Sequence, residues 1–147
     1  MVATTGVNEL VLESRDLEAA ERFYTGVLGF PVIERWHGSP TDAVWVLAGG
    51  TRIGLWKPSI GISGGRPGVH VHYALSVAAE DYDPVVEEIR SHGVTVDEVE
   101  FGGQARSAYV TDPDGNVVEF WTWDVGKGSP GAPRAITSGI QNLPQSA

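Results

Sequence analysis

Glu119 is the residue whose surroundings point most directly to chemistry. The segment Asn116–Trp123 is largely apolar and is typical of a strand, in which residues two apart share a face. Val118 and Phe120 then lie on one face, while Glu119 lies on the other among aromatic neighbours. Because burying a lone carboxylate is costly, this side chain requires a cation, a hydrogen-bond donor or a proton.

Two histidines and a second glutamate occupy comparable positions. In the expected strand His70–Val77 the apolar residues alternate, which places His70 and His72 on the opposite face, toward a cleft. The expected strand Val7–Ser14 alternates poorly, but its Leu10 and Leu12 should pack under the helix, which places Glu9 on the cleft face. Counting back from the helices that follow these strands, Glu9 and His72 are equivalent positions.

The composition excludes several kinds of site and argues against several kinds of partner. The chain has no cysteine, which excludes disulfides, thiolate nucleophiles and cysteine zinc sites. A formal net charge of −9 argues against nucleic acid and against an anionic membrane surface as partners. Met1–Gly6 has no signal-peptide pattern, and no apolar run approaches the roughly 20 residues of a membrane helix. We therefore expect a cytoplasmic protein whose partner is a small molecule.

The elements that must hold these residues follow one order twice. In the first half we expect a strand at Val7–Ser14, a helix from the N-cap Asp16 to Gly29, and strands at Pro31–Trp36, Ala43–Ala48 and Thr51–Trp56. In the second half we expect a strand at His70–Val77, a helix from the N-cap Asp83 to Gly93 with Val85, Val86 and Ile89 in the core, and strands at Val94–Phe101, Arg106–Thr111 and Asn116–Trp123.

This internal repeat predicts an α+β fold, in which two βαβββ units form a curved mixed sheet around one cleft. The expected domain covers residues 1–125, with repeat 1 at about 7–56, a linker at 57–69 and repeat 2 at about 70–123. The remaining residues, 126–147, are rich in glycine, proline and serine, and we expect them to form a mobile tail.

Three segments carry a resemblance to a known family. The helix segment Asp16–Phe30, the strand His72–Val77 and the hairpin segment Asp112–Glu119 resemble those of the vicinal oxygen chelate superfamily, which includes glyoxalases, bleomycin-resistance proteins and dioxygenases. The resemblance spans roughly residues 7 to 123. It implies a small-molecule site and a homodimer.

The resemblance also implies a ligand set. In metal-dependent members up to four ligands come from equivalent strand positions, which in this chain are Glu9, Gly54, His72 and Glu119. Gly54 has no donor atom, so the implied metal site has three ligands unless His70 substitutes. One histidine and two carboxylates suit Mn²⁺, Fe²⁺, Ni²⁺ or Zn²⁺. Open coordination positions would then hold a substrate, with Glu119 or Glu9 moving a proton as catalytic residues.

Each of these residues also has a metal-free interpretation. His72 could hydrogen-bond a neighbour inside the fold. Glu119 could form a buried ion pair with Arg52 or Arg106. Glu9 could hydrogen-bond His70 or His72 without a metal.

Two functions therefore remain open. The first is a divalent-metal-dependent enzyme of lyase, isomerase or dioxygenase type that acts on a small oxygenated substrate. The alternative is a metal-free protein that sequesters a drug or metabolite; the missing ligand at Gly54, the acidic charge and the five tryptophans favour it. For either function, the expected substrate contacts are His70, Arg52, Trp56, Tyr109 and Trp121.

Overall fold

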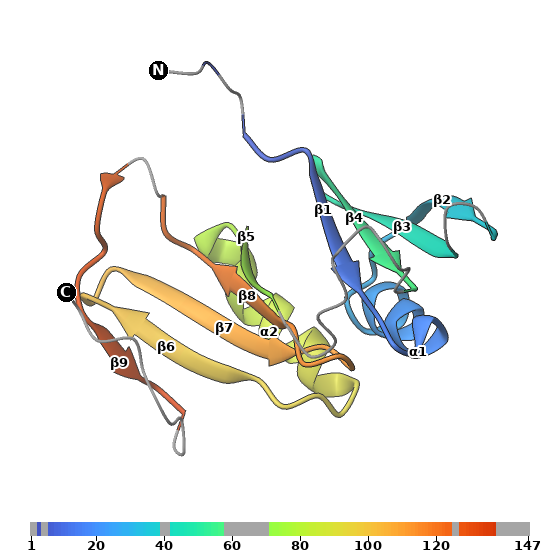
Figure 1. Cartoon of the computed structure of the whole chain (residues 1–147). Helices are drawn as coiled ribbons and strands as arrows, with labels where there is room; N and C mark the ends of the chain where they lie inside the picture. The colour runs from blue at the N-terminus through green and yellow to red at the C-terminus, as the bar shows by residue number, and fades with distance from the viewer. Residues whose placement is uncertain (1–2, 4–5, 39–41, 58–70, 125–126, 138–147) are drawn as a thin grey trace. The chain divides into compact units, whose positions relative to one another are not determined.

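The computed structural model describes residues 3, 6–38, 42–57, 71–124 and 127–137 (Figure 1). The chain divides into two compact units. Unit 1 is Met1–Val71 with the loop Asp112–Gly115, and unit 2 is His72–Thr111 with Asn116–Ala147. Each unit contains a strand, a helical segment and three further strands in that order, and unit 2 has a short additional edge strand after them. The predicted α+β class and the repeated βαβββ order are therefore confirmed.

Unit 1 is built on a four-stranded sheet in the order β1-β4-β3-β2. Its strands are β1 (Glu9–Glu13), β2 (Val32–Trp36), β3 (Ala43–Ala48) and β4 (Thr51–Trp56). β1 runs parallel to β4, and the other two pairings are antiparallel. These bounds agree with the predicted strands, because segments rich in apolar residues and the Gly49-Gly50 turn mark them.

The helix of unit 1 begins as predicted but continues differently. Asp16 caps α1 (Leu17–Glu21) by accepting a hydrogen bond from the backbone N–H of Ala19 at 3.0 Å. From Arg22 to Val27 the chain is a π-helix, η1, rather than the expected α-helix. The hydroxyl of Thr25 donates to the carbonyl oxygen of Glu21 at 2.7 Å, a local bond that competes with the regular helix ladder.

The two faces of this sheet differ. One face is apolar and packs under α1 and η1, with Leu12, Ile53 and Leu55 at most 2% exposed. This is the core side predicted for Leu12. The loop Asp112–Gly115 is tied to the same unit, because the hydroxyl of Tyr24 donates to Oδ2 of Asp112 at 2.7 Å. The other face, which we call the open face of unit 1, carries the polar and aromatic side chains described below.

Unit 2 is a five-stranded sheet in the order β5-β8-β7-β6-β9. Its strands are β5 (His72–Ser76), β6 (Asp97–Phe101), β7 (Ala105–Thr111), β8 (Val117–Trp121) and β9 (Pro133–Ala135). β5 and β8 are parallel, and the remaining pairs are antiparallel. The register sets Glu119 of β8 between Ala74 of β5 and Tyr109 of β7.

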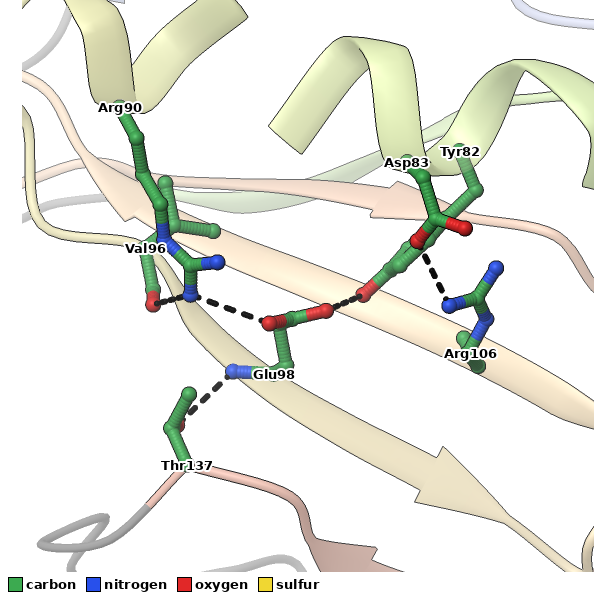
Figure 2. Close-up of polar contacts among 7 residues, drawn as sticks. All are labelled: Tyr82, Asp83, Arg90, Val96, Glu98, Arg106 and Thr137. Carbon is green, nitrogen blue, oxygen red and sulfur yellow. Dashed lines mark hydrogen bonds and ion pairs between the residues drawn. The ribbon is translucent and has the colours of Figure 1, made fainter. Parts of the chain in front are cut away.

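The helical segment of unit 2 corrects one prediction. A short 3₁₀ turn, η2 (Ala79–Asp81), leads directly into α2 (Tyr82–Ser91), so Asp83 is not the N-cap. Its carboxylate instead accepts a hydrogen bond from Arg106 at 2.8 Å (Figure 2). The earlier start is explained by Tyr82, whose fully buried ring begins the apolar face of the helix. Val86 is buried as predicted, whereas Val85 is only partly buried.

Glu98 of β6 ties α2 and the tail to this sheet. Its carboxylate accepts from Tyr82 at 3.1 Å and from Arg90 at 3.0 Å, while its backbone N–H donates to Oγ1 of Thr137 at 3.0 Å (Figure 2). The tail segment Pro133–Ala135 pairs with β6 as the edge strand β9. No strand was predicted there, because a short proline-containing edge strand has no periodic pattern that would reveal it.

None of the helices in the described ranges has the length and apolar character needed to span a membrane.

Candidate functional site

Unit 2 brings His72, Glu119 and Ser107 into one hydrogen-bonded cluster. Nε2 of His72 lies 2.9 Å from Oε2 of Glu119, and the hydroxyl of Ser107 donates to Oε1 at 2.5 Å. Glu119 is 7% exposed and Ser107 is fully buried, whereas the side chain of His72 is about half exposed. Both carboxylate oxygens therefore have partners, one of which reaches solvent.

Tyr109 stands beside this cluster on the same face of the sheet. Its ring meets that of His72 edge-on, with centroids 5.7 Å apart. Burial raises the pKa of the Tyr109 hydroxyl well above its usual range, and the negative charge of Glu119 raises it further. Tyr109 therefore keeps its proton at neutral pH and is a donor beside the carboxylate. Trp121, also expected to contact substrate, packs on Phe101 with centroids 5.4 Å apart.

The environment of Glu119 decides between the metal-free interpretations. An ion pair with Arg52 or Arg106 was one alternative. The pair with Arg106, which lies in the same unit as Glu119, is wrong, and the pair with Arg52 of unit 1 stays a prediction. Arg106 bonds Asp83 and lies over the ring of Tyr82, and Arg52 pairs with glutamates of its own unit. The hydrogen-bonded neighbour expected for His72 is Glu119 itself.

Ser107 was missed by the sequence analysis, although a signal was present. It lies two residues before Tyr109, so the strand period places both on one face. What the sequence does not reveal is the antiparallel register that sets Ser107 opposite Trp121 and Tyr109 opposite Glu119.

The open face of unit 1 centres on Arg52. Nε of Arg52 lies 3.1 Å from Oε1 of Glu9, and Nη2 donates to Oε2 of Glu34 at 2.7 Å. The guanidinium also lies 4.0 Å from the ring centroid of Trp45, a cation–π distance. Glu9, predicted as a metal ligand and catalytic residue, is thus paired with a residue that was predicted to bind substrate.

The space that a side chain at residue 54 would occupy is filled by tryptophan rings. A Cβ atom on Gly54 would lie 2.6 Å from Cζ3 of Trp45 and 2.8 Å from Nε1 of Trp56. Trp45 packs against Trp36 and Trp56, with centroid distances of 5.3 and 5.9 Å. Trp56, expected to contact substrate, is therefore part of an aromatic cluster on this face.

A divalent ion needs several donor atoms gathered around one point. Within the described part of either unit, no three histidine or acidic side chains gather closely enough to hold a metal. His72 and Glu119 supply one nitrogen and one oxygen donor from unit 2, while Glu9 in unit 1 has an arginine as its partner. His70 lies outside the described residues. The two donors of unit 2 suit such an ion, but they make up only part of the ligand set that it needs.

The chain is similar in sequence to a known protein family and to a known enzyme. The family model of the Glyoxalase/Bleomycin resistance protein/Dioxygenase superfamily matches residues 6–120. Glutathione transferase FosA of Serratia marcescens is 27% identical over 117 residues, covering 78% of each chain.

Solved structures show the same fold. A lactoylglutathione lyase from Agrobacterium tumefaciens superposes with a TM-score of 0.70 at 22% identity, covering 82% of this chain and 95% of its own. A glyoxalase/bleomycin resistance protein/dioxygenase from Nocardioides gives a TM-score of 0.67 at 25% identity, covering 89% of this chain and 91% of its own.

Proposed function

Because the chain belongs to the Glyoxalase/Bleomycin resistance protein/Dioxygenase superfamily, we propose that it is a divalent-metal-dependent enzyme acting on a small oxygenated molecule, of lyase, isomerase or dioxygenase type. The observation that carries this proposal is the pair His72 and Glu119, whose Nε2 and Oε2 atoms lie 2.9 Å apart. Two donor atoms that share one ion, each about 2.0–2.2 Å from it, lie about 3 Å from one another.

The surroundings of Glu119 support its role as a ligand. Ser107 fixes the other carboxylate oxygen from the buried side, which leaves Oε2 directed toward His72. Such an outer partner fixes the orientation of a ligating carboxylate. One imidazole and one carboxylate suit Mn²⁺, Fe²⁺, Ni²⁺ or Zn²⁺. A bound ion would supply Lewis-acid polarisation of a substrate oxygen.

The protein's own contribution would be to position substrate and protons. Glu119 is proposed to take up or return a proton at Oε2, next to a histidine that is half exposed. Tyr109, which stays protonated, is proposed to donate a hydrogen bond to a substrate oxygen. Glu9 stays a prediction as third ligand and as a catalytic residue, since Arg52 is its observed partner.

A second function has its own observation. Trp45 fills the space at Gly54, where the family places a ligand, and Arg52 neutralises Glu9. Both features favour a metal-free protein that sequesters a small molecule. A homodimer is proposed for either function, and sedimentation analysis of the purified chain tests it.

Ion binding separates the two functions. We would strip the protein with chelator and titrate it with Mn²⁺ and Zn²⁺ by calorimetry. The enzyme proposal expects one ion per chain, with affinity at least about tenfold lower in Glu119→Gln and in His72→Ala. Glu9→Gln is expected to weaken ion binding only if Glu9 is a ligand.

The matched control is a second histidine–glutamate pair. His92 lies 3.3 Å from Glu88 on the exposed surface of α2, so His92→Ala changes the same chemistry without touching the proposed site. Wild-type protein that binds no ion, or variants at His72 and Glu119 that bind it as tightly as His92→Ala does, would refute the metal-dependent enzyme and favour the sequestering protein.

A further inference from the structure

Residues 129–137, which we call the strap, lie along the outer edge of β6 without burying a side chain. β9 is the paired part of the strap and the outermost strand of the sheet (Figure 1). Every residue of the strap is exposed or partly exposed, and the side chain of Arg134 is 72% exposed. The strap is therefore held by hydrogen bonds and by the ion pair of Arg134 with Glu100, not by an apolar core.

One end of the strap docks by a close backbone contact at Gly102. The N–H of Gly102 donates to the carbonyl oxygen of Ala132 at 3.0 Å. A Cβ atom on Gly102 would lie 2.0 Å from the carbonyl oxygen of Pro130, so the strap fits here only beside a glycine. The contact is reciprocal, because a Cβ atom on Gly131 would lie 2.9 Å from Cα of Gly102.

The other end of the strap is bonded to the backbone of Glu98. The N–H groups of Ile136 and Thr137 donate to the carbonyl oxygen of Glu98 at 2.8 and 3.3 Å. The N–H of Glu98 in turn donates to Oγ1 of Thr137 (Figure 2). The carboxylate of Glu98 is bonded to Tyr82 and Arg90 of α2, so Glu98 keeps these partners when the strap is absent.

The contributions that hold the strap and those that oppose its docking are of similar size. Ordering the backbone of one residue disfavours the docked form by about five- to thirtyfold, and the strap has nine residues. Each hydrogen bond favours docking by about two- to tenfold, and an exposed ion pair by no more than about fivefold. A segment with exposed hydrogen bonds and no buried side chain opens more readily than a packed core.

Opening of the strap would change one border of the candidate site. β6 would become the edge strand of the sheet while it stays paired with β7. Pro133 would leave its position opposite Phe101, whose ring packs on Trp121. Because Trp121 lies on β8 two residues after Glu119, the open and closed forms differ beside the strand that carries the candidate ligand.

We propose that residues 129–137 form a detachable strap, which docks at Gly102 and Glu98 and opens as one unit while the rest of unit 2 stays folded. This conformational device needs neither an ion nor a substrate. It therefore stands or falls independently of the proposed function.

Native-state hydrogen exchange of the full-length ¹⁵N-labelled protein, followed by two-dimensional NMR, tests the opening. The amides of Glu98, Gly102, Ile136 and Thr137 are bonded between β6 and the strap. We expect them to share one level of protection, at least about tenfold below that of the β7–β8 ladder, with little dependence on denaturant. Protection and denaturant dependence equal to those of the ladder would mean that the strap leaves only in global unfolding, and a complete lack of protection would mean that it does not dock. Either result overturns the proposal.

A matched pair of substitutions in the turn after β6 separates docking from backbone strain. Gly102→Ala and Gly103→Ala both place a side chain at positive φ, but a Cβ atom on Gly103 has only Glu100 nearby, at 3.7 Å. This strain is present whether the strap is docked or open, so it cancels from the opening equilibrium. Relative to the β7–β8 ladder, Gly102→Ala should lower the protection of the Ile136 and Thr137 amides by about fivefold or more. Gly103→Ala should leave that protection within about twofold of wild type.

A second pair tests the same contact from the side of the strap. Gly131 and Gly128 both have positive φ, but a Cβ atom on Gly128 meets nothing within 4 Å. Gly131→Ala should therefore lower the protection of the Glu98 amide about fivefold or more further than Gly128→Ala does. The dispersion of each spectrum reports whether the variant folds. Equal effects of the two members of either pair would show that the glycine contact does not hold the strap, and would overturn the proposal.

Discussion

Replacing Gly54 by alanine tests whether tryptophan has taken the place of a side chain on β4. The added Cβ would lie 2.6 Å from Cζ3 and 2.7 Å from Cη2 of Trp45. Carbon atoms prefer separations of about 3.5–4.0 Å, so the indole would have to move by about 1 Å. Trp45 cannot move freely, because Trp36, Trp56 and the guanidinium of Arg52 surround it.

Two effects of opposite sign contribute to the stability of this variant. Alanine in a strand is favoured over glycine by about 0.5–1 kcal/mol through lost backbone freedom of the unfolded chain. Overpacking of a filled core costs about 1–3 kcal/mol. Taking the middle of each range, we expect Gly54→Ala to lower the free energy of unfolding by about 1 kcal/mol, which corresponds to a drop of roughly 2–4 °C in Tm for a chain of this size.

The assay is thermal unfolding followed by near-UV circular dichroism, which also reports the packing of the tryptophans. Gly26→Ala is the matched control: this residue lies in η1, its φ is not positive, and a Cβ there meets no atom within 4 Å. That control should be as stable as wild type or up to about 1 kcal/mol more stable. If Gly54→Ala unfolds at or above the wild-type temperature, the space at Gly54 is not occupied as described.

Four further substitutions give expected outcomes. Ser107→Ala should weaken ion binding in calorimetry by about 10- to 100-fold, because Glu119 loses the donor that orients it; an unchanged affinity would contradict this. Arg52→Gln should raise the affinity for the ion by up to about fivefold if Glu9 is a ligand, and leave that affinity unchanged if it is not. Tyr24→Phe removes a buried hydrogen bond to Asp112 and should lower unfolding free energy in urea by about 1.5–3 kcal/mol, with an unchanged m-value. The hydrogen bond from Arg35 lowers the pKa of Glu21, so this pair stabilises the fold above the ordinary glutamate pKa of about 4.3 and loses that effect as pH falls through the lowered value. Glu21→Gln should therefore cost at most about 1 kcal/mol at pH 7, and the difference from wild type should vanish in acid; a difference that persists there would contradict the assignment.

The sequence predicted the strands well because their signals are local. The unbroken apolar run of β3, the apolar residues of β4 and the glycine turn between them determine both strands to the residue. In β5 the alternation of apolar residues places His72 on the face opposite to Tyr73 and Leu75. The start of α2 was misplaced because Asp83 and Pro84 look like a helix start, whereas burial of Tyr82 outweighs that preference.

The partners of the candidate residues were harder to predict, because they depend on which strands lie side by side. Glu119 was expected to need a donor or a cation, and the structure provides Ser107 and His72. Arg106, which lies in the same unit and was considered for that role, bonds Asp83 instead. Periodicity gives the face of each strand but not its register, and the register is what places Ser107 within reach of Glu119.

The equivalent positions 119 in unit 2 and 54 in unit 1 are occupied in opposite ways. In unit 2 the cross-strand neighbour of Glu119 is Tyr109, and the two side chains coexist. In unit 1 the cross-strand neighbour of Gly54 is Trp45, and not even a Cβ fits beside it. Glycine at 54 and tryptophan at 45 are therefore linked by sterics, so a carboxylate placed at 54 alone would displace the indole and expose a buried aromatic group before it supplied a donor. The ion that we propose would therefore be held first by the donors of unit 2, because the equivalent position in unit 1 has no donor atom and no space for one.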